Sequence, residues 1–190
     1  DALRKLAEFD SDADVRGKAW AALADTTEDA AIRYKMLAVI NDPSRDLAER
    51  GGAAIGLYGV ADQDAVAAAL EAFYQEGGKA RAKALEAMWR SLWKPYAKFF
   101  APNLGDADPA IVRQALRGAG YFQLTSEIEK IASYFNRDEP FDDLREDALF
   151  AYALAMPGET TRGRVRGMLR KIDELAQLAG DDAKHRPAQT

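Results

Sequence analysis

The fold is decided by a short pattern that first reads Asp14-Val15-Arg16-Gly17-Lys18-Ala19: an acidic residue, a small or apolar residue, an arginine, and an alanine three positions later. Close variants follow as Glu49-Arg50-Gly51-Gly52-Ala53, Ala80-Arg81-Ala82-Lys83-Ala84, Ile111-Val112-Arg113-Gln114-Ala115-Leu116 and Leu144-Arg145-Glu146-Asp147-Ala148. The five arginines are 34, 31, 32 and 32 residues apart. A fixed period of this length is typical of a repeat array, in which each unit buries its apolar face against its neighbours.

Composition indicates that the units are helical. Alanine accounts for 38 of the 190 residues. It is the strongest intrinsic helix former, and its small side chain lets helices approach closely. Isoleucine, valine and threonine are sparse, and no stretch shows the sustained alternation of a strand. The sequence therefore predicts an all-α protein.

Each period has room for two helices, and polar turn residues mark where they begin. The arginine-bearing helices are expected after turns at residues 10–12, 41–44, 77–78, 105–109 and 136–140. Short polar side chains there can accept hydrogen bonds from the free N–H groups of the first helical turn. The other helices are predicted at about residues 28–40, 62–76, 95–104 and 125–135, with a half-helix at 2–9, a closing helix at about 160–178 and a disordered tail at 180–190.

The recurring Asp…Val-Arg-x-x-Ala core resembles HEAT repeats, especially the short bacterial form, over five units. The resemblance implies a right-handed α-solenoid of antiparallel helix pairs, with about 10–11 helices in a single domain over residues 1–179. It also implies that the arginine helices line the concave side and that an Asp–Arg ladder ties successive units together. The third unit departs from the pattern, because Gly77-Gly78-Lys79 replaces its acidic turn, and this leaves its Asp–Arg link open. A tetratricopeptide array has a similar period, but its Trp…Leu-Gly…Tyr spacing is absent.

Charge and composition limit the classes of partner. The net charge is −5 and the pI about 5.1. Because nucleic-acid affinity depends on neutralising phosphates, we expect no nucleic-acid partner. There is no cysteine, which excludes disulfides and thiolate metal sites. We expect a soluble protein without membrane insertion, since no apolar run approaches the ~20 residues of a span; the compartment stays open, with the cytoplasm slightly favoured over the periplasm.

Catalytic motifs are missing. The one histidine, His185, lies in the tail, which argues against Ser-His-Asp, Cys-His and histidine-metal schemes. Ser91-Leu92-Trp93-Lys94 matches the Ser-x-x-Lys of serine acyl enzymes, but the accompanying motifs are absent and so short a match is common by chance. We therefore expect no enzyme in this chain, no catalytic residue, no metal ligand and no cofactor.

Two columns of residues are candidates for a function. The first is the recurring arginine, which either builds an inter-repeat ladder by bonding the carbonyls and carboxylates of the preceding turns or contacts an acidic partner. The candidate contacts are Arg81 and Arg113 of this column, together with Arg117. The second lies eight residues further along and reads Ala24, Tyr58, Trp89, Tyr121 and Ala153. Aromatic side chains occupy its three central units. They either fill gaps beside small residues or anchor a partner, as tyrosine and tryptophan often do in interfaces.

These features favour a noncatalytic scaffold that binds a protein or peptide on its concave face, with Tyr58, Trp89 and Tyr121 as anchors. The alternative is a C-terminal helical repeat domain of a larger enzyme, for example a metallopeptidase, which shapes access to a catalytic site elsewhere. The chain begins at Asp1 rather than methionine, so we expect a processed product or an excised piece, with other domains of a longer parent chain as possible partners. Lesion recognition on DNA is a third hypothesis, which the acidic balance disfavours.

Overall fold

The computed structural model describes residues 2–157, and all the regular structure in this range is helical. Ten α-helices and five short 3-10 helices occur there without any strand, which confirms the predicted all-α class. The half-helix expected at residues 2–9 is observed as α1, Ala2–Phe9. The closing helix expected at 160–178, the tail at 180–190 and His185 lie outside the described residues.

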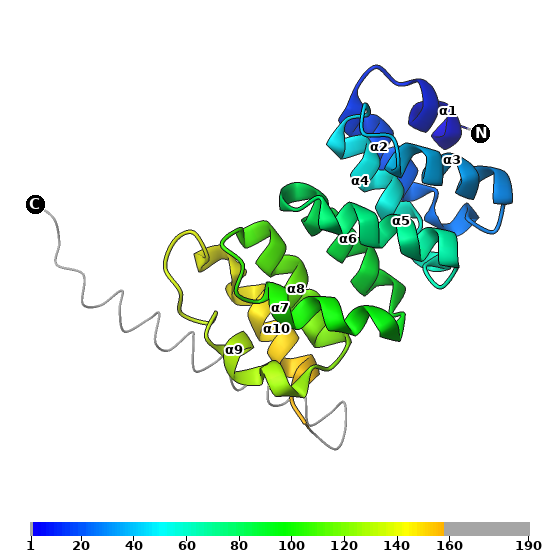
Figure 1. Ribbon diagram of the computed structural model, residues 1–190. Helices are drawn as coiled ribbons and strands as arrows, with labels where there is room; N and C mark the ends of the chain where they lie inside the picture. The colour runs from blue at the N-terminus through cyan, green and yellow to red at the C-terminus, as the bar shows by residue number, and fades with distance from the viewer. Residues whose placement is uncertain (1, 158–190) are drawn as a thin grey trace, which may run out of the picture.

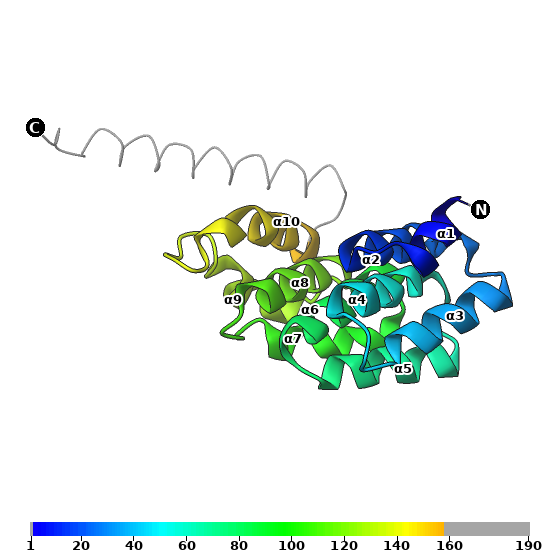
Figure 2. The ribbon, with the colours of Figure 1, turned by 90° about the horizontal axis from the view of Figure 1, so that it is seen from above.

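The α-helices alternate between two rows, seen as two layers in Figure 2. One row carries the recurring arginine and consists of α2 (Ala13–Ala22), α4 (Leu47–Gly56), α6 (Gly78–Ser91), α8 (Pro109–Tyr121) and α10 (Arg145–Ala155). The other consists of α1, α3 (Ala30–Ile40), α5 (Asp64–Gln75), α7 (Phe100–Asn103) and α9 (Ile128–Ala132). The 3-10 helices are Ala24–Thr26, Tyr58–Val60, Lys94–Phe99, Thr125–Glu127 and Asp142–Leu144.

Contacts between the helices follow the sequence period. Each arginine helix packs against the next one in its row, and each helix of the other row packs against the arginine helix that follows it in the chain. The chain thus passes from α1 and α2 at one end of the molecule to α9 and α10 at the other (Figure 1). As a result, side chains one period apart in sequence become neighbours in space.

The acidic turns start helices as the sequence predicts. The carboxylate of Asp12 accepts a hydrogen bond from the N–H of Asp14 at 2.8 Å. Asp108 accepts in the same way from Ala110 at 2.8 Å, with Pro109 in the first turn. These bonds satisfy N–H groups that have no partner inside the helix.

We expect Asp108→Ala to lower the free energy of unfolding by about 1 kcal/mol, because the N–H of Ala110 loses its acceptor at the start of α8. Urea denaturation followed by circular dichroism measures the change. Asp108→Asn keeps an oxygen acceptor at the same place and should unfold close to the wild type. Equal losses in both variants would contradict a capping role.

Two helices are shorter than expected. The segment predicted as one helix at 95–104 forms the 3-10 helix Lys94–Phe99 followed by the four-residue α7. It contains two prolines, Pro95 and Pro102, which have no N–H group and interrupt α-helical hydrogen bonding. The helix predicted at 125–135 is regular α-helix only over Ile128–Ala132. There the Ser133 hydroxyl donates to the Lys130 carbonyl at 2.7 Å, a local bond that competes with helical pairing.

Alanine and glycine let the arginine helices approach one another. A Cβ atom added to Gly52 would lie 2.0 Å from the carbonyl oxygen of Gly17, so the backbones of α2 and α4 meet without side chains between them. A Cβ atom on Gly118 would lie 2.0 Å from the ring of Phe100, a fully buried residue of α7. The buried core lies between the two rows of helices. It consists of two hydrophobic clusters, and Leu124 packs against both of them.

Candidate functional site

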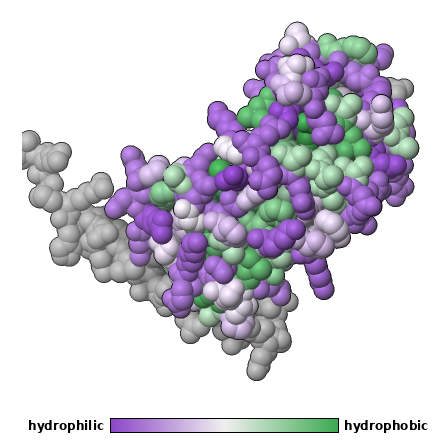
Figure 3. Space-filling view, in the orientation of Figure 1, coloured by the Kyte–Doolittle hydropathy of each residue, from purple (hydrophilic) through white to green (hydrophobic). Residues whose placement is uncertain are grey.

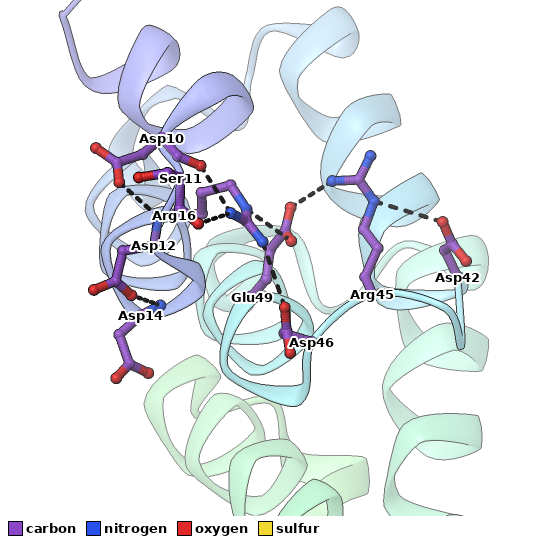
Figure 4. A network of polar contacts seen from close by, with 9 residues as sticks. All are labelled: Asp10, Ser11, Asp12, Asp14, Arg16, Asp42, Arg45, Asp46 and Glu49. Atoms are coloured by element: carbon purple, nitrogen blue, oxygen red, sulfur yellow. Dashed lines mark hydrogen bonds and ion pairs between the residues drawn. The ribbon is translucent and has the colours of Figure 1, made fainter.

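The recurring arginine links each repeat to the next, and the first link is the most buried. Arg16 Nε lies 3.0 Å from Glu49 Oε2, and Arg45 Nη1 lies 2.5 Å from the other carboxylate oxygen (Figure 4). The Glu49 side chain is only 1% exposed. Asp46 lies 3.5 Å from Arg16, and Asp42 lies 3.5 Å from Arg45. One buried carboxylate therefore holds two arginines from two different repeats.

The next three arginines make equivalent links. Each reaches an acidic side chain of the unit that follows: Arg50 bonds Glu76 at 2.5 and 3.0 Å, Arg81 lies 3.6 Å from Asp106, and Arg113 bonds Asp147 at 3.1 Å and also Asp143. Burial lowers the pKa of Arg113, but the two carboxylates raise it more, and the net shift is upward. A ladder between repeats is therefore observed for these residues, but its carboxylates come from the unit that follows, whereas the sequence predicted those of the preceding turns.

The third unit keeps its link in spite of its unusual turn. Gly77 has a φ of 80°, a conformation that glycine adopts readily and other residues avoid. The acid that binds Arg50 is Glu76, the residue just before that turn. A search of the sequence for an acid within the turn misses this residue by one position.

Four of the arginines also bond carbonyls near the end of the preceding helix. Arg16 Nη1 donates to the carbonyls of Asp10 at 2.7 Å and Ser11 at 3.2 Å. Arg50 Nε donates to Ile40 at 3.0 Å, Arg145 Nε to Phe135 at 2.8 Å, and Arg81 Nε to Tyr74 at 3.5 Å. Carbonyls at helix ends have no partner inside the helix. These arginines thus join the two rows as well as successive repeats.

Aromatic side chains cross three successive arginine helices. The rings of Trp89 on α6 and Tyr121 on α8 stack with their centroids 5.0 Å apart and an angle of 1° between planes. Tyr121 meets Phe150 of α10 edge to face at 5.7 Å. Tyr121 and Phe150 are 41% and 40% exposed, while Trp89 is half-buried. We call Trp89, Tyr121 and Phe150 the aromatic row.

Polar side chains contact Trp89 and lie near Tyr121 in the aromatic row. The indole N–H of Trp89 donates to Gln114 Oε1 at 2.8 Å. The guanidinium of Arg90 lies 4.8 Å from the centroid of the Trp89 ring, within cation–π range. Arg117 lies one turn before Tyr121 on α8 and bonds Asp147, the acid that also holds Arg113. A hydrogen bond from α6 to α8 therefore holds Trp89, while Tyr121 and Phe150 are held by ring contacts with their neighbours.

Tyr58 lies apart from the aromatic row. It is half-buried at the start of a 3-10 helix and lines two open surface cavities, one with Ser91 and Trp93 and the other with Thr27 and Arg33. Ala153, at the other end of the predicted column, is buried. The structure therefore joins Trp89 and Tyr121 but does not extend the column to Tyr58.

Phe150 is the member of the aromatic row that sequence reasoning missed. It lies five residues after Arg145, whereas the predicted column takes the residue eight positions after each arginine. That column therefore does not contain Phe150. It lies one helical turn before Ala153, and residues three apart share a helix face. A search that included the neighbouring turn would have found it.

Comparison of the chain with protein-family models, with curated proteins and with solved structures gives no match. Within residues 2–157, no three side chains of the metal-ligating types gather into a possible metal site. In the same range, no helix combines the length and the apolar character needed to cross a membrane.

Proposed function

We propose that the chain is a noncatalytic scaffold that binds a protein or peptide partner through the aromatic row. The observation that carries this is the joint exposure of Tyr121 and Phe150 on neighbouring helices, backed by Trp89. Single exposed aromatic residues are common, but adjacent ones mark interaction surfaces more often. The face shown in Figure 3 mixes apolar patches with hydrophilic side chains.

We also propose that the two rows of helices form a right-handed α-solenoid of the HEAT kind, with the arginine helices on its concave side. The support is the regular pairing of helices and the arginine link that recurs between units. In such an array the contacted face is extended, so a partner can reach several repeats at once. The aromatic row spans three of them.

The charges beside the aromatic row favour a partner with acidic residues next to its apolar ones. Arg90 on Trp89 is bound to Glu86 at 2.9 Å, and Arg117 is bound to Asp147 at 2.7 Å. Both arginine side chains are more than a third exposed. Their acids are only 14% and 15% exposed, so these pairs stay formed, and the remaining N–H groups of each guanidinium can donate to a partner's carboxylate.

We expect Tyr121→Ala to weaken peptide binding about tenfold or more, because truncating an aromatic anchor typically costs at least ~1–2 kcal/mol. Peptides are first selected from a random displayed library against the wild-type chain, and their affinities are then measured by calorimetry. Leu3→Ala is the matched control, since it removes an apolar side chain that is 42% exposed on α1, in the other row.

The control should bind as the wild type does, and thermal unfolding should show that both variants keep the fold. If the selected peptides bind Tyr121→Ala and Phe150→Ala with unchanged affinity, the aromatic row is not the binding surface. Tyr58→Ala tests whether Tyr58 belongs to the binding site together with the aromatic row. It should leave the peptide affinity unchanged if Tyr58 lies outside the site.

A further inference from the structure

A shallow cavity of about 170 Å³ lies on the arginine helices where α2, α4 and α6 meet, outside the aromatic row. Small residues of α2 and α4 line it, among them Gly17, Ala48 and Gly52, because the two backbones meet there without side chains between them. Lys18 of α2 and Lys83 of α6 complete this part of the lining. The cavity thus combines a floor of small residues with two lysines from two different repeats.

A continuous series of contacts connects this cavity to the aromatic row. Lys83 Nζ lies 3.3 Å from Glu86 Oε2, and Arg90 Nη2 lies 2.9 Å from Glu86 Oε1. The guanidinium of Arg90 in turn lies over the ring of Trp89, which belongs to the aromatic row. The cavity and the aromatic row are therefore two parts of one surface of the arginine helices.

The cations on this surface are more exposed than the acid with which they pair. The side chains of Lys83 and Arg90 are 45% and 40% exposed, whereas that of Glu86 is 14% exposed. Lys18 is exposed and makes no ion pair or side-chain hydrogen bond in the described part of the chain. A partner that approaches this surface therefore meets N–H groups that can donate to its carboxylates.

One acid, Asp14, also lines the cavity. It lies in the first turn of α2, where the positive end of the helix dipole stabilises a carboxylate. Within residues 2–157 it forms no ion pair with Lys18, which follows one turn later. Since two lysines line the cavity together with this one carboxylate, the cavity favours an anionic ligand over a cationic one.

The dimensions of the site limit what it can hold. Pockets for small-molecule ligands usually measure about 300–1,000 Å³, so this cavity suits a single side chain. Neighbouring helices pack about 8–10 Å apart, which places α4 about 16–20 Å from α8, the helix that carries Tyr121. An extended peptide covers this distance in about five or six residues.

We propose that this cavity binds an aspartate or glutamate of the same peptide that covers the aromatic row, with the carboxylate between Lys18 and Lys83. The proposal rests on the proposed function and adds a second acidic position to the partner. This position lies about five or six residues from the aromatic or apolar anchor, and is distinct from the acids next to the anchor that Arg90 and Arg117 can bind.

The first test selects random displayed peptides in parallel against the full wild-type chain and the double variant Lys18→Met with Lys83→Met. Methionine keeps a long, unbranched side chain and removes the charge. Wild-type peptides should carry an acid about five or six residues from their anchor. Peptides from the double variant should keep the anchor and lose this remote acid. Lys5→Met with Lys98→Met is the matched control, because it removes two exposed lysines outside the arginine helices and should select the same peptides as the wild type.

Calorimetry then compares one wild-type peptide with its amide form, in which the remote aspartate or glutamate is replaced by asparagine or glutamine. The amide form should bind the wild-type chain about fivefold more weakly, as is usual for partly exposed charge pairs, and the two forms should bind the double variant equally. Added salt should weaken the acidic peptide more than the amide form, because it screens the lysines. Lys18→Met alone removes a side chain without ion pairs and should weaken the acidic peptide about twofold.

Equal affinities of the two peptides for the wild-type chain would overturn the proposal, as would a difference that persists in the double variant while thermal unfolding shows the fold intact. Tyr121→Ala distinguishes this failure from that of the proposed function. Peptides that bind Tyr121→Ala more weakly but do not distinguish the lysine variant from the wild type remain bound to the aromatic row, and they overturn the carboxylate site alone. If no peptide is selected, both proposals are wrong.

Discussion

Replacing Glu49 with alanine is expected to lower the free energy of unfolding by about 3–5 kcal/mol. The carboxylate is buried and bonds Arg16 at 3.0 Å and Arg45 at 2.5 Å, so its removal leaves the Arg16 guanidinium largely buried without its main partner. Breaking one side of a buried ion pair typically costs this much. Urea denaturation measures the change, and the helical signal of the folded variant shows that the structure persists.

Asp42→Asn is the matched control. Asp42 also contacts Arg45, at 3.5 Å, but both side chains are more than 40% exposed, and exposed pairs contribute at most ~1 kcal/mol. A double variant, Arg16→Met with Glu49→Leu, removes both charges and should lose less stability than the two single changes together. If Glu49→Ala were no worse than Asp42→Asn, the buried link would not hold the first two repeats together.

The second large effect is expected for Gly52→Ala. Its Cβ atom would lie 2.0 Å from the carbonyl oxygen of Gly17, and the next nearest atoms are also backbone, which cannot rotate away. The α2 and α4 helices must separate to admit it. Overpacking of this kind costs about 1–3 kcal/mol and occasionally more, and we expect a loss of about 3 kcal/mol here.

The expected loss of stability is opposite in sign to the usual effect of replacing glycine with alanine in a helix. In an uncrowded helix, replacing glycine with alanine stabilises by about 0.5–1 kcal/mol, because alanine restricts the unfolded chain and favours helix. Gly59→Ala is the control, since the nearest atom to its Cβ would be Thr27 Oγ1 at 3.8 Å, an ordinary contact. A stability gain for Gly52→Ala would show that α2 and α4 do not meet at Gly17 and Gly52.

Features that depend on neighbouring residues could be predicted from the sequence. The alanine content gave the helical class, and the acids at Asp12 and Asp108 marked helix starts, because a capping bond involves residues only two positions apart. The arginine ladder was also predictable, since a structural link must recur with the repeat. The interruption of the helix expected at 95–104 was predictable too, because Pro95 and Pro102 lie within it.

Features that depend on how helices rotate and pack could not be predicted in this way. Tyr58 and Tyr121 stand at the same distance from their arginines, yet only Tyr121 joins the aromatic row. Phe150 belongs to the aromatic row although it lies five residues, not eight, after its arginine. The cavity beside Lys18 and Lys83 is formed by residues from three helices, so no local pattern in the sequence indicates it.

The central claim is that the repeats present the aromatic row to a peptide partner. Its most direct test is calorimetric titration of a library-selected peptide into the wild-type chain and into the double variant Tyr121→Ala with Phe150→Ala. The account predicts binding weakened by about a hundredfold or more, with an unchanged midpoint of thermal unfolding, because two exposed anchors are lost and no core residue is changed. Unchanged affinity in the folded double variant would contradict it.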